Sequence, residues 1–306
     1  MSMKKIVMAV TLMVFSQMVG AQDVCFSQYH SCQMYLNPSL AGNCDGSRLA
    51  LNYRNQWPYM GGLQTINLCF DQNLEAAKSG VGAQVIAYWP SELQSYYDIK
   101  LYYAYNLQVA DEFFVRAGIG GGLNINQFFG SKATLPDDLD NSGIHESVED
   151  ITIIKPDFSV GFSFCMEDVF YVGVSADHVT LQADNPVRYV VSTGANFRMD
   201  SDDFVVSPSA AFIRQNGYSL LNIGAVVRYQ SIEAGVGYNA NLTNEMMKNI
   251  HSLTLIGGIT MMDVDLRYSY DIVFGGVGVK THGAHEISVV YCFGGYDNGY
   301  RNRKRW

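Results

Sequence analysis

The chain has 306 residues, of which 48% are hydrophobic, 13% aromatic and only 16% charged, and its formal net charge is −9. High hydrophobicity with few charges excludes a long disordered protein. An acidic chain is also a poor candidate for binding nucleic acid, because contacts to phosphates need clustered Lys and Arg. Such a basic cluster occurs only in the last six residues, from Arg301 to Trp306.

The N-terminus has the three parts of a secretory signal peptide. Lys4 and Lys5 precede an apolar run over 6–15, and the small residue Ala21 ends the segment. A positive start, an apolar run and a small residue at the cleavage site predict that residues 1–21 are removed on export. The run is too short to cross a bilayer core of about 30 Å, which argues against an uncleaved membrane anchor.

After this segment, alternation of apolar and polar residues dominates the chain. In the longest example, Tyr96 to Gln108, one face carries Tyr97, Ile99, Leu101, Tyr103, Tyr105 and Leu107. Such alternation is typical of a sheet with one apolar and one polar face. We expect fourteen strands, centred near residues 51, 68, 84, 102, 120, 161, 173, 194, 209, 224, 236, 256, 268 and 289.

From the fourth strand on, the predicted connections alternate in length. Short ones are expected at 109–112, 167–168, 200–203, 230–231 and 262–263, and longer ones at 129–154, 177–188, 240–250 and 272–284, with a tight exception at 215–217. Short turns at one end and long loops at the other are typical of a transmembrane barrel, which in bacteria has an even number of strands. We therefore predict an all-β protein, a transmembrane outer-membrane β-barrel of about 14 antiparallel strands over residues 47–293, with a basic tail over 294–306. A soluble sandwich or a lipocalin-like barrel is the alternative.

Five charged residues alternate onto the polar face of the predicted strands. They are Arg48, Arg54, Asp98, Lys100 and Arg116. We expect them to form a polar network in the lumen, an arrangement that suits a plugged barrel and a narrow pore equally well.

Six cysteines stand at positions 25, 32, 44, 69, 165 and 292. Export makes disulfides possible, and the three cysteines within 25–44 favour a local bridge there. Their spacing contains no CxxC pair, so we expect no zinc site.

Motifs for catalysis or cofactor binding are weak. The run Gly118 to Leu123 resembles a dinucleotide fingerprint, but its sixth position is Leu and no helical pattern follows it. Its glycines are better explained by close packing inside a barrel. The acidic residues of 137–150 could bind Ca²⁺ through oxygen ligands, although a solvated loop is the simpler interpretation. We expect no catalytic residue, no cofactor and no metal ligand.

Several blocks of sequence resemble a known family. After the signal peptide come Phe26-Ser27-Gln28-Tyr29 and Tyr35-Leu36-Asn37-Pro38-Ser39-Leu40-Ala41-Gly42, and the first strand ends Tyr53-Arg54-Asn55-Gln56-Trp57-Pro58. Near the C-terminus are Tyr268-Ser269-Tyr270-Asp271 and His285-Glu286-Ile287-Ser288-Val289-Val290-Tyr291-Cys292-Phe293. In combination, over the whole mature chain, these blocks resemble the PorP/SprF family of Bacteroidetes outer-membrane proteins, which is associated with type IX secretion and gliding.

The resemblance implies a non-enzymatic, multi-pass component of the type IX machinery in the cell outer membrane. Such proteins are thought to dock periplasmic ring or peptidoglycan-linked partners, or to hold the C-terminal sorting domain of a secreted protein at the cell surface. We expect the docking surface on the periplasmic turns and on an N-terminal periplasmic segment, residues 22–46. The candidate docking or structural residues are Phe26, Gln28, Tyr29, Asn37, Pro38, Arg54, Asn55, Gln56, Trp57, His285 and Glu286.

The alternative function is a porin-like channel for small solutes. A barrel of fourteen strands is wide enough to leave a lumen unless side chains or the N-terminal segment fill it. A plugged docking barrel would show no conductance in a planar bilayer, whereas a channel would conduct.

Overall fold

The structure is a computed structural model and describes residues 23–132, 148–166, 169–180, 185–199, 204–243, 251–275 and 281–294. Strands make up most of these residues. None of the helices in these ranges is long and apolar enough to cross a membrane. They are single 3-10 turns: η1 (Tyr29–Ser31), η2 (Gln33–Tyr35), η3 (Pro38–Leu40), η4 (Pro58–Met60), η5 (Glu75–Ala77) and η6 (Gly130–Lys132).

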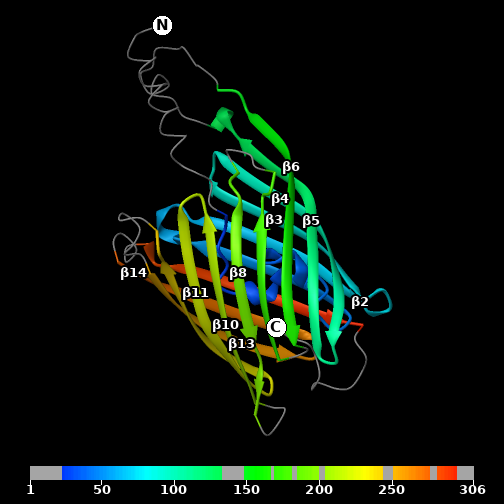
Figure 1. Cartoon of the computed structure of the whole chain (residues 1–306). Coiled ribbons are helices and arrows are strands. Elements are labelled where there is room, and N and C mark those ends of the chain that lie inside the picture. Colours follow the sequence, from blue (N-terminus) through cyan, green and yellow to red (C-terminus); the bar gives the residue numbers. More distant parts are fainter. Residues whose placement is uncertain are drawn as a thin grey trace, which may run out of the picture.

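The strands follow one another around a single sheet (Figure 1). In chain order they are β1 (Ser47–Gln56), β2 (Leu63–Leu74), β3 (Ser79–Ser91), β4 (Gln94–Ala110), β5 (Phe113–Phe128), β6 (Ile151–Met166), β7 (Phe170–Asp177), β8 (Arg188–Ala195), β9 (Phe197–Arg198), β10 (Phe204–Gln215), β11 (Tyr218–Tyr229), β12 (Ile232–Asn241), β13 (His251–Met261), β14 (Val264–Phe274) and β15 (Ala284–Phe293).

The sheet closes because β15 pairs antiparallel with β1 as well as with β14. Since β8 and β9 both pair with β10, β9 is the continuation of β8 beyond Asn196. The described residues therefore form the closed barrel of fourteen antiparallel strands that the sequence predicts.

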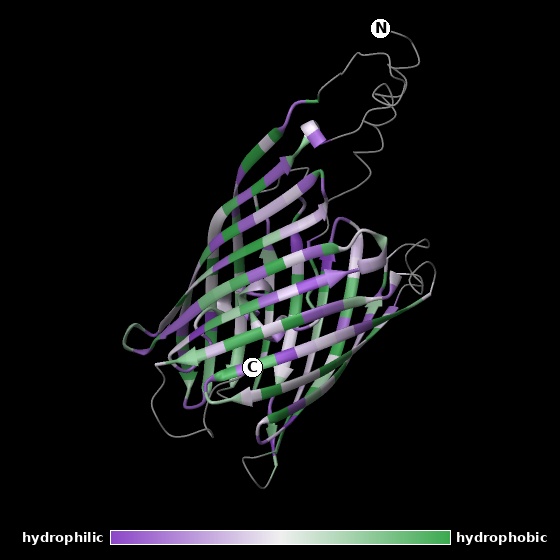
Figure 2. Cartoon of the chain, turned by 180° about the vertical axis from the view of Figure 1, so that it is seen from behind, coloured by the Kyte–Doolittle hydropathy of each residue, from purple (hydrophilic) through white to green (hydrophobic). Residues whose placement is uncertain are grey.

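Side chains alternate between the lumen and the outside of the barrel. On β1, Arg48 and Asn52 are 4% and 1% exposed, whereas Leu49 and Leu51 are 40% and 43% exposed. Polar side chains thus point inward and apolar ones outward, the reverse of a soluble protein. Figure 2 shows polar and apolar residues alternating along the strands. An apolar outer surface matches the hydrocarbon of a bilayer, and a closed sheet leaves no unpaired edge there.

The two ends of the barrel differ in their connections. At one end, here named the short-turn end, adjacent strands are joined by two to five residues, as at 111–112 and 230–231. At the other, the long-loop end, the connections include 129–150, 178–187, 242–250 and 275–283. The exception predicted near 215–217 is a tight turn in which Asn216 and Gly217 both have positive φ, as a two-residue hairpin requires. The predicted alternation of lengths is confirmed.

The three longest strands exceed by five or more residues the 9–11 that suffice to cross a bilayer. β4 has 17 residues, and β5 and β6 have 16 each. The pairing of β6 with β7 begins only at Ser159, so residues 151–158 extend past β7 at the long-loop end. The wall formed by β4, β5 and β6 therefore rises above the rest of the barrel (Figure 1).

Residues 23–46, here named the plug, lie inside the barrel. They bond to strands on all sides, including β2, β6, β10 and β15, a set of contacts that can be made only from within the lumen. The plug is drawn in dark blue inside the barrel in Figure 1. We expected residues 22–46 to form a periplasmic segment. The described part instead fills the lumen, because its polar groups find their partners on the polar inner face of the wall.

An apolar core forms where the plug meets the wall. Phe26 and Leu36 are 3% and 2% exposed, and they cluster with Val190 of β8 and Ile213 of β10. The ring of Phe26 packs edge-on against that of Tyr35, with centroids 5.3 Å apart. Burial of these side chains favours the plugged state through the hydrophobic effect.

Glycines in the wall allow the plug to approach closely. A Cβ atom on Gly118 would collide with the backbone of Ser39, and one on Gly80 would collide with the backbone carbonyl of Ala41. The close packing that we predicted for the glycines after residue 117 is therefore confirmed at Gly118. In this barrel the packed neighbour is the plug.

Candidate functional site

Four groups of contacts fix the plug to the wall, and the first is centred on Arg54 of β1. The guanidinium of Arg54 lies 2.7 Å from the carboxylate of Asp271 and 3.1 Å from that of Glu286. The same Glu286 carboxylate accepts backbone hydrogen bonds from Ser27 (2.8 Å) and Gln28 (3.0 Å). We name Arg54, Asp271 and Glu286 the Arg54 anchor. It holds the first part of the plug against β1, β14 and β15.

Gln28 and Tyr29 extend this contact across the lumen. The side-chain amide of Gln28 donates to the hydroxyl of Ser269 at 3.0 Å and accepts from that of Ser288 at 2.5 Å. The hydroxyl of Tyr29 donates to Ser209 on β10 at 2.9 Å. The block that begins at Phe26 thus serves to seat the plug.

Asn37 joins the plug to β6 and β7. Its Oδ1 accepts the backbone N–H of Ser39 at 2.9 Å, which caps η3, and Pro38 occupies the first position of that turn. Its Nδ2 donates to the carbonyls of Phe162 (3.1 Å) and Val174 (3.3 Å). Asn37 therefore shapes the turn and attaches it to the wall at the same time.

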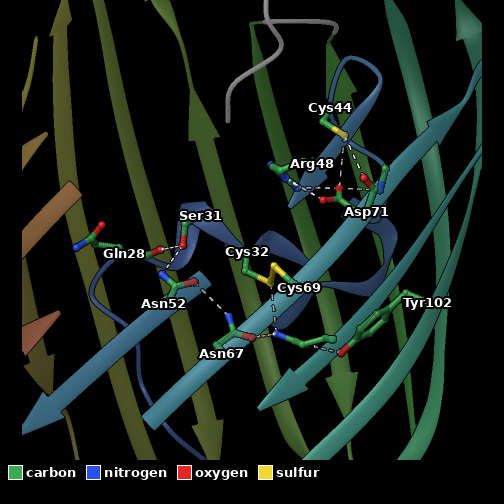
Figure 3. Close-up of a disulfide and its surroundings, with 12 residues drawn as sticks. Gln28, Ser31, Cys32, Cys44, Arg48, Asn52, Asn67, Cys69, Asp71 and Tyr102 are labelled. Carbon is green, nitrogen blue, oxygen red and sulfur yellow. Dashed lines mark hydrogen bonds and ion pairs between the residues drawn. A yellow bond between two sulfur atoms is a disulfide. The ribbon is translucent and has the colours of Figure 1, made fainter. Parts of the chain in front are cut away.

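Asp71 on β2 anchors the end of the plug that leads into β1 (Figure 3). Arg48 donates two hydrogen bonds to its carboxylate, at 2.8 and 2.9 Å, and the backbone N–H of Gly42 donates a third at 3.0 Å. The Sγ of Cys44 lies 3.7 Å from the same carboxylate. Asp71 is 0% exposed, so its charge is balanced by Arg48 within the lumen.

A disulfide between Cys32 and Cys69 ties the plug covalently to β2 (Figure 3). Our expectation of a local bridge within 25–44 was wrong, and both Cys25 and Cys44 are free thiols. The reason is that the plug turns back into the lumen, which places Cys32 beside the inner face of β2. Cys32 and Cys69 are therefore neighbours in space although 37 residues separate them in sequence.

Replacing Cys32 and Cys69 together by serine is expected to lower the free energy of unfolding by roughly 2–5 kcal/mol, because the unfolded chain gains freedom when a native disulfide is lost. A urea titration of the folded band on unheated gels measures this change. Mass spectrometry of an unreduced digest tests the bond itself. Cys165→Ser, which alters a buried free thiol, is the control, and an equal loss in that variant would contradict the prediction.

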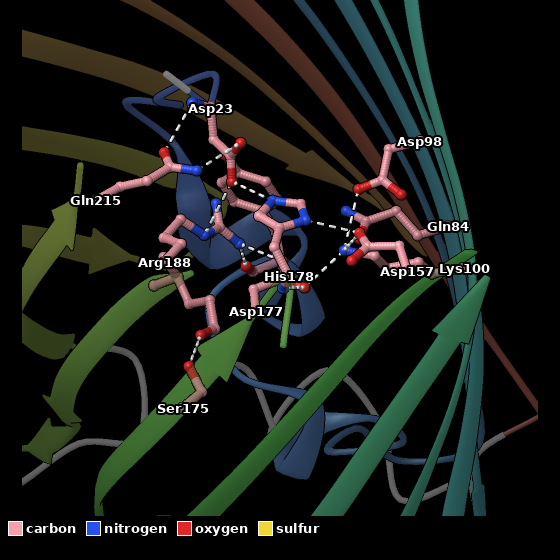
Figure 4. A network of polar contacts seen from close by, with 12 residues as sticks. Asp23, Gln84, Asp98, Lys100, Asp157, Ser175, Asp177, His178, Arg188 and Gln215 are labelled. Atoms are coloured by element: carbon pink, nitrogen blue, oxygen red, sulfur yellow. Dashed lines mark hydrogen bonds and ion pairs between the residues drawn. The ribbon is translucent and has the colours of Figure 1, made fainter. Parts of the chain in front are cut away.

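The fourth group is a charged network near the long-loop end, here named the His178 network (Figure 4). It consists of Asp23, Asp98, Lys100, Asp157, Asp177, His178 and Arg188. At its centre the ammonium of Lys100 lies 2.6 Å from Asp177, 2.8 Å from Asp157 and 3.1 Å from Asp98. Lys100 is 1% exposed, so these carboxylates replace its solvent shell.

His178 and Arg188 connect this network to the plug. The imidazole of His178, just beyond the end of β7, lies 2.7 Å from Asp157 and 2.9 Å from Asp23 of the plug. Arg188 donates to the backbone carbonyl of Tyr35 at 2.6 Å, and its guanidinium lies 4.1 Å from the centre of the Tyr35 ring. The plug is therefore held at both its polar and its aromatic groups.

The charges of the network support one another. Burial acts to lower the pKa of His178, but the carboxylate of Asp23 and the other acidic neighbours outweigh it and raise this pKa to about 10. Burial acts to raise the pKa of Asp23, but His178 and Arg188 outweigh it and hold this pKa far below its usual range. Both groups are charged at neutral pH.

Three side chains of the network have a geometry that could hold a metal ion. The ligand atoms of Asp23, Asp177 and His178 all lie within 4.8 Å of one another. However, Lys100 and Arg188 already neutralise these carboxylates, and a protonated imidazole has no lone pair for a metal. The arrangement is better explained as an ion-pair network that fixes the start of the plug.

Four other candidate residues make none of the contacts described above. Asn55 and His285 pair across β1 and β15 and alternate toward the outside, where the ring of His285 lies 4.8 Å from that of Tyr270. Gln56 ends β1, and Trp57 begins the next loop with a positive φ of 58°. These four residues belong to the outer face and the long-loop end.

All five charged residues predicted to face the lumen do so, but several of their partners were not singled out in the sequence. The partners include Asp71, Asp157, Asp177 and Asp271, and His178 and Arg188 pair in turn with two of these carboxylates. The sequence did contain a signal for these residues on the strands, because the period-two alternation places them on the polar, inward face. A charge on the inner face of a barrel needs a counter-charge nearby, so inward Asp and Arg positions should be paired before any are dismissed.

Some predictions concern residues that the structure does not describe. The signal peptide and the basic tail fall within 1–22 and 295–306, and most of the acidic loop considered for Ca²⁺ falls within 133–147. Among the described residues of that loop, Asp150 accepts a hydrogen bond from the backbone of Ser131 at 2.9 Å.

Solved structures with a similar fold are outer-membrane proteins. Omp33 of Acinetobacter baumannii aligns with a TM-score of 0.52 and 10% identity over 82% of this chain and 100% of its own. The CymD monoaromatic hydrocarbon channel aligns with a TM-score of 0.53 and 13% identity over 91% of this chain and 96% of its own. The toluene transporter TbuX of Ralstonia pickettii aligns with a TM-score of 0.51 and 13% identity over 84% of this chain and 92% of its own. At these identities the likeness concerns the fold, which is that of an outer-membrane β-barrel.

Sequence comparison identifies the family. No curated protein matches this chain significantly. The family described as type IX secretion system membrane protein PorP/SprF matches residues 18–291, which include the plug and nearly all of the barrel. The chain therefore belongs to the PorP/SprF family of type IX secretion system membrane proteins.

Proposed function

We propose that this protein is a non-enzymatic docking component of the type IX secretion machinery in the outer membrane. The observation that supports it most is the anchored plug, because a lumen occupied by a segment fixed with buried ion pairs and a disulfide is a poor route for a large solute. In such a barrel the turns and loops at the two ends are the surfaces that can bind protein partners. By analogy with other bacterial barrels, the short-turn end faces the periplasm and the long-loop end faces the cell surface. Residues 1–21 are proposed to be cleaved on export.

The periplasmic docking surface lies on the short turns and the basic tail, since the plug is buried. This end carries exposed apolar side chains: Met262 in the β13–β14 turn is 76% exposed and Met199 after β9 is 61% exposed. Exposed apolar side chains in a turn are suited to a protein partner. Periplasmic ring proteins or peptidoglycan-linked proteins are the partners that we propose.

Cross-linked purification from outer membranes tests this assignment. The double variant Met199→Asp and Met262→Asp is expected to lose most of the periplasmic partner that the wild type recovers, because it places two charges in the apolar contact. The matched control changes the exposed Tyr59 and Met60 in the β1–β2 loop at the other end to Asp. Loss of the partner only in this control would instead assign docking to the surface end, as expected for the sorting domain of a secreted protein.

An open porin is the second candidate function. It is favoured by the likeness of the fold to a channel and a transporter, but the plug spans the lumen from Asp23 near the long-loop end to Asn43 near the short turns. The wild-type barrel is therefore expected to lack the large conductance of an open fourteen-strand pore.

A further inference from the structure

We propose that a narrow hydrated passage for water and small uncharged solutes runs through the lumen beside the plug, along β10 to β14, with its constriction at Tyr29 and His30. This passage is separate from the docking function, because it concerns the part of the lumen that the plug leaves unfilled. Its walls are the plug on one side and the strands drawn in yellow to orange in Figure 1 on the other.

Two adjoining cavities form the half of the passage toward the long loops. The larger has a volume of about 170 Å³ and is lined near the loops by Gln56 and Trp57. The next has a volume of about 20 Å³. Both are lined by Ser27, Asn222 and Asn239, so the two cavities adjoin at these side chains.

A third cavity continues the line toward the short-turn end. Its volume is about 50 Å³, and Arg228 and Glu233 lie at its far side. It shares Tyr29, His30 and Ser209 with the small middle cavity. Because neighbouring cavities share lining residues, the three are successive parts of one course through the barrel, and Tyr29 and His30 stand where the middle cavity meets the third.

Polar atoms without protein partners point to water along this course. Within the described residues, the Oδ1 of Asn222, the Nε2 of His30 and the Oε1 of Gln33 have no hydrogen-bond partner. Asn222 lines the first two cavities, His30 the last two, and Gln33 the third. Because buried polar groups are nearly always hydrogen-bonded, and because each cavity is large enough for at least one water, these atoms are best satisfied by water.

The plug fills the two sides of the lumen unequally. Gly80 and Gly118 lie against plug backbone that leaves no room for a Cβ atom. At Gly237 on β12, an added Cβ would meet its nearest neighbour, the Cβ of Thr254, only at 3.4 Å, which is ordinary contact. The plug is therefore pressed against β3 and β5, and the space that remains lies along β10 to β14.

The lining selects uncharged solutes. In the middle cavity it consists of hydroxyl and amide groups, such as Ser209, Asn222 and Asn239, with apolar and glycine residues between them. The charged groups at the two ends are paired within the protein: Arg54 with Asp271 at 2.7 Å, and the side chain of Arg228 with Glu233 at 2.9 Å. An ion would lose its hydration in the middle without a counter-charge, whereas water or urea exchanges one set of hydrogen bonds for another.

Permeation of urea into proteoliposomes, compared with permeation of maltotriose, tests the passage. His30→Ala removes the ring at the constriction and is expected to raise the urea rate several-fold above wild type without admitting maltotriose. Gly237→Met places a side chain in the middle cavity and is expected to reduce the rate to that of protein-free vesicles, also when combined with His30→Ala. Gly257→Met is the matched control, because Gly257 is exposed on β13 with no atom near its Cβ position.

Folding of every variant is verified by its heat-modifiable migration on gels, so that only folded barrels are compared. An unchanged urea rate in folded His30→Ala would overturn the proposal. An equal reduction by Gly237→Met and Gly257→Met would also overturn it, since the effect would not depend on the lumen. Neither result bears on docking, which is measured by partner recovery.

Discussion

Replacing Glu286 with alanine is expected to lower the free energy of unfolding by about 3–5 kcal/mol, the range seen when one partner of a buried ion pair is removed. Glu286 is 0% exposed and accepts from Arg54 and from two backbone N–H groups of the plug. Its loss leaves those two backbone donors without an acceptor, and Arg54 keeps Asp271 as its remaining carboxylate partner. We therefore expect the first part of the plug to detach before the barrel itself unfolds.

A urea titration followed by migration on unheated gels measures the stability, and protease sensitivity near residue 27 reports the release of the plug. Glu286→Gln keeps an acceptor and should lose less. His285→Ala is the matched control, since the neighbouring residue faces the outside and is only partly buried, and its effect should stay below about 1 kcal/mol, as for surface changes. If Glu286→Ala were as stable as His285→Ala, the Arg54 anchor would not hold the plug.

The barrel could be predicted from the sequence because its signal is local. Each strand alternates with period two, and the closed sheet repeats this rule fourteen times, so errors of one or two residues at strand ends do not change the fold. Lys100 is an example: its phase relative to Leu101 assigns it to the lumen without any knowledge of its partners. The predicted connections 109–112 and 129–154 match the extent of β5, but β6 begins at Ile151, inside the loop that the sequence predicted.

The position of the plug could not be predicted in the same way. Residues 23–46 show no period, and their contacts are with strands up to 260 residues away in sequence. The disulfide shows the difficulty, because Cys32 has two cysteines nearby in sequence and bonds to neither. The signal that was available is a charge balance: Arg48, Arg54 and Lys100 on the inner face demand acceptors, and an open aqueous pore would leave fewer of them paired with protein.

The second large effect is expected for Lys100→Met in the His178 network. Methionine keeps the length of the side chain but removes an ammonium that lies within 3.1 Å of Asp98, Asp157 and Asp177 together. His178 and Arg188 still pair with Asp157 and Asp177, but Asp98 loses its cation in a site from which water is largely excluded. The free energy of unfolding should therefore fall by about 3–5 kcal/mol. Because Asp157 also holds His178, the start of the plug should loosen as well.

A double variant separates repulsion from lost packing. Adding Asp157→Asn to Lys100→Met removes one of the opposing charges and is expected to restore part of the stability, which a double-mutant cycle measures as a coupling between the two positions. Lys78→Met, at an exposed position beyond β2, makes the same chemical change without a network and should alter stability by less than about 0.5 kcal/mol. Additive effects of the two lumen substitutions would mean that Lys100 acts through packing alone. Coupling would show that the plug is retained by the electrostatic balance of the lumen, as the paired charges at the Arg54 anchor and at Asp71 also indicate.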